Sequence, residues 1–253
     1  MSMASAEPEA HPVEPRLCIL KADSVREALQ GEHGDYPLMF RRLLVAAGWS
    51  ARAIDERDVI ADGPPPALEH QAYLITGSRF SVYDDEPWIA PLALFVGQAL
   101  AARRKVVGIC FGHQLLAHFF GGRVSKATEG WQVGVTQVAV QAQRGWMQPP
   151  APTFAVLASH QDQVTALPSD ARVLGSTEQC PVAAFELGAC ALAIQGHPEF
   201  EKPYSQALLD LRQTILGDAV YTAGQESLLQ PTNGALLGQW IVQFLRQPPT
   251  ELA

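Results

Sequence analysis

An apolar run that stops at a glycine-flanked cysteine constrains the fold of this chain more than any other feature. In VVGICFGHQLLAHFFGG, residues 106–122, the apolar residues up to Ile109 are typical of a buried strand, and the periodic residues from about Gly112 are typical of a helix. Gly108 and Gly112 relieve crowding where the chain turns. The pattern predicts a nucleophile elbow, a turn that holds the side chain of Cys110 at the carboxyl edge of a sheet.

The segments before this turn alternate between short apolar runs and longer periodic runs. Strands are expected at LCILKA, WSARAID, AYLITGS and KVVGIC, with helices at DYPLMFRRLLVAAG and PWIAPLALFVGQALAARR. Runs that are apolar on both faces are typical of a parallel sheet covered by helices. We therefore expect an α/β fold with a flavodoxin-like, mostly parallel central sheet.

The pattern changes after Gly122. Short, closely spaced runs rich in Val, Ala and Leu predict antiparallel additions to the same sheet, and the run CALAIQG at residues 190–196 is expected to return to its centre. Two helices are expected near residues 203–216 and 234–246.

One domain is expected over residues 16–247, because 253 residues suffice for one large core and no linker is long enough to demand a second domain. Residues 1–15 are acidic and rich in Pro and Ala, and they lack the apolar middle of a secretion signal. We expect them to form a flexible tail, with a short C-terminal tail at residues 248–253.

Composition and charge exclude several classes of protein. Nearly half of the residues are apolar and 17% are charged, which is typical of a globular chain. A net charge of -8 without a basic stripe argues against nucleic acid as a ligand, and the broken apolar runs argue against a membrane span. Four cysteines without C-x-x-C spacing are typical of reduced thiols, so a cytoplasmic protein is expected. The histidine spacing predicts no metal site.

The flanking glycines distinguish Cys110 from the other cysteines. A lone cysteine in an apolar context is usually a small buried hydrophobe, and this interpretation is kept for Cys18, Cys180 and Cys190. At Cys110 the following helix would direct its N-terminus at the sulfur, which favours the thiolate. We therefore interpret Cys110 as a candidate nucleophile, which needs a base.

The segment IQGHPEF supplies a candidate base. Pro198 restrains His197 to an extended conformation, and in an extended chain residues i and i+2 point the same way. His197 and Glu199 can therefore lie on one side, with the carboxylate orienting the imidazole as in a Cys-His-acid triad.

At this point the chain resembles a known family. GICFGHQ matches the G-x-C-x-G-x-Q nucleophile motif of the class I (triad) glutamine amidotransferases, and GHPEF resembles their H-P-E segment. LITGSRFSVYDDEPWI resembles the oxyanion-strand loop of free-standing members, and ASHQDQVTALP is similar to a segment in the amidotransferase half of GMP synthase. The resemblance extends from about Leu17 to Glu199.

The resemblance implies a role for each matching residue. It assigns the chemistry to Cys110 as nucleophile, His197 as general base and acid, and Glu199 as orienting carboxylate. It assigns the oxyanion hole to the backbone N–H of Phe111 and to that of Ser78 or Gly77. It assigns substrate binding to Gln114, Gln161 and Asp162. The family loop often reads Gly-Gly-Pro or Pro-Gly-Pro, whereas TGSRFS has Ser78 and Arg79 in place of the Gly and Pro.

The implied reaction is cleavage of the γ-carboxamide of glutamine through a γ-glutamyl thioester, without a cofactor. No synthetase motif follows Glu199, so the ammonia is expected to pass to a separate acceptor protein, an ATP-dependent synthetase or ligase subunit. The alternative is a stand-alone hydrolase of γ-glutamyl peptides or conjugates. A non-catalytic binding or regulatory protein on the same fold is the third hypothesis, and the intact Cys110, His197 and Glu199 count against it.

Overall fold

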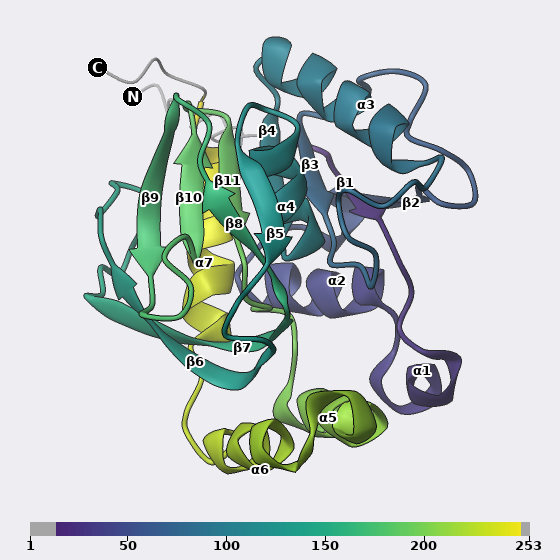
Figure 1. Cartoon of the computed structure of the whole chain (residues 1–253). Helices are drawn as coiled ribbons and strands as arrows, with labels where there is room; N and C mark the ends of the chain where they lie inside the picture. Colours follow the sequence, from purple (N-terminus) through teal and green to yellow (C-terminus); the bar gives the residue numbers. More distant parts are fainter. Residues whose placement is uncertain (1–13, 249–253) are drawn as a thin grey trace, which may run out of the picture.

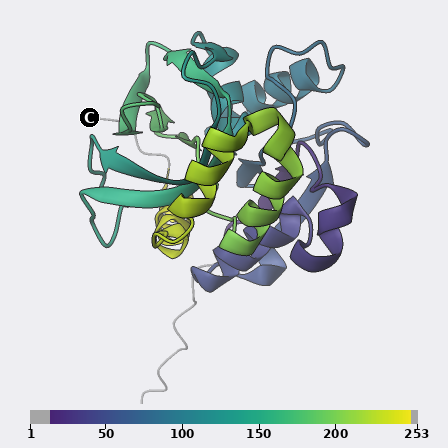
Figure 2. The ribbon, with the colours of Figure 1, turned by 60° about the horizontal axis from the view of Figure 1, so that its bottom comes forward.

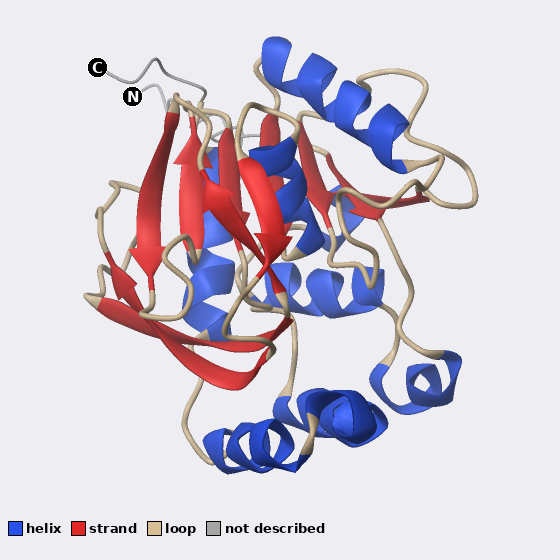
Figure 3. Cartoon of the chain, in the orientation of Figure 1, coloured by secondary structure: helices blue, strands red, loops and turns tan. Residues whose placement is uncertain are grey.

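A nine-stranded sheet runs through residues 14–248, the part of the chain that this computed structural model describes (Figure 1, Figure 3). Across the sheet the strands are β2 (Ile54–Asp58), β1 (Leu17–Lys21), β3 (Ala72–Ile75), β4 (Lys105–Ile109), β11 (Ala191–Ile194), β10 (Ala184–Leu187), β9 (Ala171–Ser176), β6 (Gln132–Val140) and β7 (Thr153–His160). The first five run parallel, and each later strand pairs antiparallel with its neighbour. In chain order the parallel strands follow the 2-1-3-4-5 order of flavodoxin-like sheets. The predicted fold class is confirmed.

Helices cover both faces of the parallel strands. They are α2 (Tyr36–Ala46) and α7 (Gly234–Arg246) on one face, and α3 (Ile89–Ala101) and α4 (Phe111–His118) on the other. In β1, Leu17 and Ile19 pack in the core layer with α2 and α7, whereas Cys18 and Leu20 pack in the layer with α3 and α4. Successive side chains of a strand point to opposite faces, so both faces must be apolar.

Smaller elements surround this core. They are the two-stranded sheet of β5 (Arg123–Lys126) and β8 (Asp162–Ala166), and the helices α1 (Glu27–His33), α5 (Lys202–Leu216) and α6 (Asp218–Ser227). The small sheet contacts α4, and α5 and α6 pack against each other and against β6 (Figure 2). These elements place side chains from distant parts of the sequence around the carboxyl ends of the parallel strands.

Several expected boundaries were wrong. The segment WSARAID was predicted to be a strand, but Ala51–Ala53 form a single 3-10 turn and β2 begins only at Ile54. The short elements α1, α6, β5 and β8 were not predicted. Of the expected tails at residues 1–15 and 248–253, residues 1–13 and 249–253 lie outside the described residues. Glu14, which is described, forms an ion pair with Arg246 at 2.8 Å.

No helix within residues 14–248 combines the length and the hydrophobicity needed to cross a membrane.

The turn between β4 and α4 has the strained geometry of an elbow. Cys110 has φ 52° and ψ −96°, a conformation that non-glycine residues rarely adopt. A Cβ atom on Gly108 would lie 2.4 Å from the carbonyl oxygen of Gly112, and one on Gly112 would lie 2.7 Å from the carbonyl oxygen of Ile75. Both glycines are therefore required because the backbone of α4 approaches β4 and β3 too closely for a side chain.

This packing predicts that Gly108→Ala destabilises the protein. The added methyl group must push α4 away from the sheet, and we expect the free energy of unfolding to fall by about 1–3 kcal/mol. Urea denaturation measures this change. Gly145→Ala is the matched control, because a Cβ atom there meets nothing within 4 Å. Equal stability of the two variants would contradict the close approach.

Candidate active site

Three neighbouring parallel strands deliver the candidate residues to one edge of the sheet. In the register of the sheet, Ile109 of β4 lies beside Ile194 of β11, and Gly108 lies beside Ile75 of β3. The N–H of Cys110 donates to the carbonyl of Ile194 at 2.9 Å, which continues the sheet by one hydrogen bond. The residues that follow β3, β4 and β11 therefore converge, as the carboxyl ends of parallel strands do.

Cys110, His197 and Glu199 form a buried cluster at this edge, which we refer to as the Cys-His-Glu cluster. His197 Nδ1 and Glu199 Oε1 lie 2.8 Å apart. A Cβ atom on Gly77 would lie 2.8 Å from Cε1 of His197 and 3.6 Å from Cβ of Cys110, so the glycine packs directly against both side chains. The three sequence-predicted side chains thus meet at one place.

Two further contacts hold His197, one to its backbone and one to its ring. Its backbone N–H donates to the carbonyl of Leu157 in β7 at 2.7 Å. Phe200 stacks on the imidazole with ring centroids 3.9 Å apart and planes 7° from parallel. The imidazole is therefore fixed by a strand, a carboxylate and an aromatic face, and it can rotate little.

Electrostatics favour the protonated form of His197. Burial lowers the pKa of the imidazole, but the charge of Glu199, the charge of Cys110 and the hydrogen bonds to both outweigh it and raise that pKa to about 10. Glu199 Oε2 has no hydrogen-bond partner among the described residues, so His197 is the main compensation of this buried carboxylate. Because this pKa lies well above 7, His197 is protonated at neutral pH and can donate a proton beside Cys110.

A chain of amides reaches the thiol from the other side. Gln195 Nε2 lies 3.6 Å from the sulfur of Cys110, and its Oε1 accepts from Gln114 Nε2 at 3.2 Å. Gln114 Nε2 also donates to the carbonyl of Asp162 at 2.9 Å, which leaves the Oε1 of Gln114 as its remaining acceptor. The sequence analysis missed Gln195. The sequence indicates Gln195 only as a single polar residue directly after the fully apolar strand β11.

The loop after β3 lies beside Cys110. The buried Thr76 hydroxyl donates to the carbonyl of Gly77 at 3.0 Å, and Thr76 in turn accepts from the N–H of Ala22 at 3.0 Å. In a trans peptide the N–H points opposite to the carbonyl. With the Gly77 carbonyl held by Thr76, the N–H of Ser78 is turned to the other side.

Arg79 fixes the same loop through Asp23. The backbone N–H and the Nε of Arg79 each donate to Asp23 Oδ2 at 2.9 Å, and Asp23 is 3% exposed. Asp23 follows β1, the strand next to β3. Arg79 stands where the family loop often has proline, and its fork of hydrogen bonds to the Asp23 carboxylate holds the loop at this position.

The thiol opens into a cavity of about 190 Å³, which we refer to as the thiol cavity. Its walls include the three residues that the resemblance assigned to substrate binding, Gln114, Gln161 and Asp162, together with Ser78. The carboxylate of Asp162 accepts from the hydroxyl of Ser81. An acceptor at Gln114 and a carboxylate at Asp162 suit the ammonium end of an amino acid.

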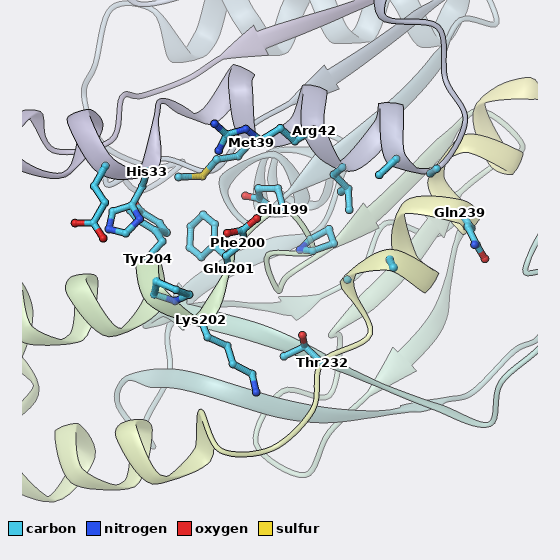
Figure 4. Close-up of a pocket in the computed structure, with 18 residues that line it drawn as sticks. His33, Met39, Arg42, Glu199, Phe200, Glu201, Lys202, Tyr204, Thr232 and Gln239 are labelled. Atoms are coloured by element: carbon cyan, nitrogen blue, oxygen red, sulfur yellow. The ribbon is translucent and has the colours of Figure 1, made fainter.

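A larger cavity of about 690 Å³ lies against Glu199 and not against Cys110 (Figure 4). Met39 of α2, Tyr204 of α5 and Gln239 of α7 lie around it. The described residues of its walls include no cysteine, so the candidate nucleophile Cys110 faces only the smaller thiol cavity of the two.

The remaining cysteines and histidines of the core have a structural character. Burial raises the pKa values of Cys18 and Cys180 to about 12, so both thiols stay protonated. Burial also lowers the pKa of His160 to about 4, which keeps this wall residue of the thiol cavity neutral. Within the described residues, no cluster of three or more His, Cys, Asp or Glu side chains could hold a metal ion.

Comparison with known proteins identifies what this arrangement is similar to. Residues 77–211 match the family model described as glutamine amidotransferase class-I. Gamma-glutamyl peptidase 3 of Arabidopsis thaliana is 32% identical over 149 residues, which cover 56% of this chain and 59% of that protein. A putative glutamine amidotransferase-like protein of Schizosaccharomyces pombe is 30% identical over 90% of this chain and 98% of its own length.

Among solved structures, a glutamine amidotransferase from Thermotoga maritima has the same fold. It superposes with a TM-score of 0.70 at 18% identity, covering 92% of this chain and 99% of its own. The central sheet and its helices are therefore shared with that enzyme.

The electrostatics of the Cys-His-Glu cluster predict the titration of His197. In the intact protein the imidazole should stay protonated across neutral pH and lose its proton only near pH 10. In Glu199→Gln the largest raising influence is gone, burial dominates, and the pKa should fall by several units. Nitrogen NMR of labelled histidine follows both titrations. A pKa near 6.5 in the intact protein would contradict the coupling of the three groups.

Proposed function

The chain belongs to the class-I glutamine amidotransferase family, and from this premise we propose that it is a γ-glutamyl hydrolase that acts without a partner subunit. The observation that carries this proposal is the loop after β3, which is seated against Cys110 by the Arg79–Asp23 fork and the Thr76 hydroxyl, all within one chain. A subunit whose oxyanion hole is completed only when a partner binds does not need a loop that is already fixed in the isolated chain.

The reaction proceeds in two halves. The Cys110 thiolate attacks the γ-carbonyl of a glutamyl compound, and the negative charge that develops on its oxygen accepts hydrogen bonds from backbone N–H groups. The protonated His197 gives its proton to the leaving nitrogen, and a γ-glutamyl thioester remains. His197, now neutral, takes a proton from water, which attacks the thioester, releases glutamate and restores the thiolate.

The oxyanion hole is assigned to Phe111 and Ser78. Phe111 is the first residue of α4, so its N–H has no acceptor within the helix. The carbonyl of Gly77 is held by Thr76, which supports the N–H of Ser78 over that of Gly77 as the second donor. Gln114, Gln161 and Asp162 bind the amino-acid end of the glutamyl group. No step in this scheme requires a cofactor.

Ammonia supply to a separate synthetase or ligase subunit is the second candidate function. It was the leading expectation from the sequence, and the similarity of ASHQDQVTALP to the amidotransferase half of GMP synthase favours it. Both candidates use the same Cys-His-Glu cluster, and they differ in the preferred leaving group and in the need for a partner. The four cysteines are free, which supports the cytoplasmic location expected from the sequence.

Turnover by the purified chain distinguishes these functions. We expect hydrolysis of a γ-glutamyl dipeptide to exceed that of glutamine, because the loop is complete without a partner. Cys110→Ser should abolish both reactions, and intact mass should show one adduct of a diazo-ketone glutamine analogue on the parent protein and none on this variant. A thermal melt checks that the variant is folded. Glutaminase activity that appears only with an added partner would reverse the order of the two candidates, and inactivity without labelling would leave a binding protein.

The Arg79–Asp23 fork predicts a selective loss of turnover. Arg79→Ala should lower kcat for glutamyl substrates by about 10- to 100-fold, because the oxyanion donor beside the thiol is then poorly placed. The rate at which iodoacetamide labels Cys110 should change little, because the thiol and its base are intact. Arg172→Ala, an exposed position on β9, serves as control. Equal losses of turnover and labelling would indicate a general disturbance of the site.

A further inference from the structure

The walls of the thiol cavity carry more basic than acidic side chains, although the chain as a whole has a net charge of -8. Its charged walls are Arg79, Lys126 and Arg212 against the single carboxylate of Asp162. Arg79 is occupied by Asp23, and Asp162 accepts from Ser81. Within the described part of the chain, neither Lys126 nor Arg212 has an acidic partner. Because Lys126 and Arg212 are not paired with an acidic side chain among residues 14–248, this wall of the cavity can bind an anionic group of the substrate.

Arg212 is held in place by neutral contacts only. Its Nη1 donates to the hydroxyl of Ser159 in β7 at 2.7 Å, and its guanidinium lies 5.4 Å from the ring centre of Trp131. Its other N–H groups have no acceptor among residues 14–248. The guanidinium is thus oriented by a hydroxyl and an aromatic face, while part of its planar fork stays available for a carboxylate.

Arg212 lines the thiol cavity and is bonded to β7, the strand that also anchors the backbone of His197. His197, which protonates the leaving nitrogen, is bonded to Leu157 of β7, and Arg212 is bonded to Ser159, two residues further along the same strand. In the proposed binding mode the amino-acid end of the substrate lies at Gln114, Gln161 and Asp162. The wall formed by Arg212 and Trp131 then remains for the leaving group.

We propose that Arg212 and Trp131 form a subsite for a carboxylate on the leaving group, so that this chain selects γ-glutamyl peptides whose second residue ends in a free carboxylate. The inference rests on the proposed γ-glutamyl hydrolysis and names its substrate class. In a γ-glutamyl dipeptide this carboxylate is one carbon from the scissile nitrogen, whereas glutamine releases ammonia and has nothing to offer Arg212. Lys126 adds a second positive charge at the exposed edge of the cavity.

Binding to a protein that cannot turn over tests the subsite independently of catalysis. In the Cys110→Ala background, calorimetry compares γ-glutamyl-alanine with γ-glutamyl-alaninamide, which differ only in the leaving-group carboxylate. We expect the acid to bind more tightly, and Arg212→Met to lower this preference about 10-fold. Arg212→Lys keeps the positive charge but lacks the planar guanidinium, so it should retain part of the preference for the acid over the amide. Arg172→Met is the matched control and should leave it unchanged.

Each contrary result overturns the subsite. Equal binding of the two dipeptides, or no binding of either, removes the selection by the carboxylate. If Arg212→Met still binds γ-glutamyl-alanine more tightly than the amide by the same factor, Arg212 does not form the subsite. If Arg212→Met weakens the binding of both dipeptides equally, Arg212 contacts the glutamyl end instead. Failure of the proposed function is seen separately, as a parent protein that does not hydrolyse γ-glutamyl-alanine although the Cys110→Ala protein binds it selectively.

Discussion

The rest of the site depends on the backbone at Cys110, which is held at φ 52° between β4 and α4. A non-glycine residue in such a conformation costs about 1–3 kcal/mol, and it persists only where the surroundings determine it. Here the surroundings are two close approaches, of Gly108 to the start of α4 and of Gly112 to β3. The strain has a chemical use, because this turn moves the thiol out of the sheet and towards the imidazole of His197, with the start of α4 directly behind it.

The electrostatics of the cluster follow from burial. A carboxylate as buried as Glu199 is costly unless it is paired, and its pair is an imidazole that is equally buried. The pairing raises the pKa of His197 and keeps a proton where the proposed reaction needs one. Such an arrangement contributes little to stability compared with an apolar core of the same size. It fixes the position and the protonation state of His197, as the proposed role of a general acid requires.

Most of the architecture could be predicted from local patterns, because strands that are buried on both faces and the elbow at Cys110 have strong sequence signals. His197 and Glu199 could be found because proline fixes their backbone. The contacts of Gln195, Arg79 and Arg212 could not be predicted, because each joins segments that are distant in the sequence. Arg79 meets Asp23 only when β1 and β3 pair, and Arg212 meets Ser159 only when α5 packs on β7. The short elements α1, α6, β5 and β8 escaped prediction because their packing, and not their pattern, makes them stable.

These distant contacts divide the site into a constant part and an adjustable part. The cluster and the proposed oxyanion donors follow the parallel strands or begin α4, and the core sets the positions of these elements. The walls of the thiol cavity come from the additions: Lys126 from β5, Trp131 before β6 and Arg212 from α5. A substitution on these outer elements changes the charge and shape that a leaving group meets without moving the thiol. Substrate choice in this fold can therefore vary at its edge while the chemistry at its centre stays the same.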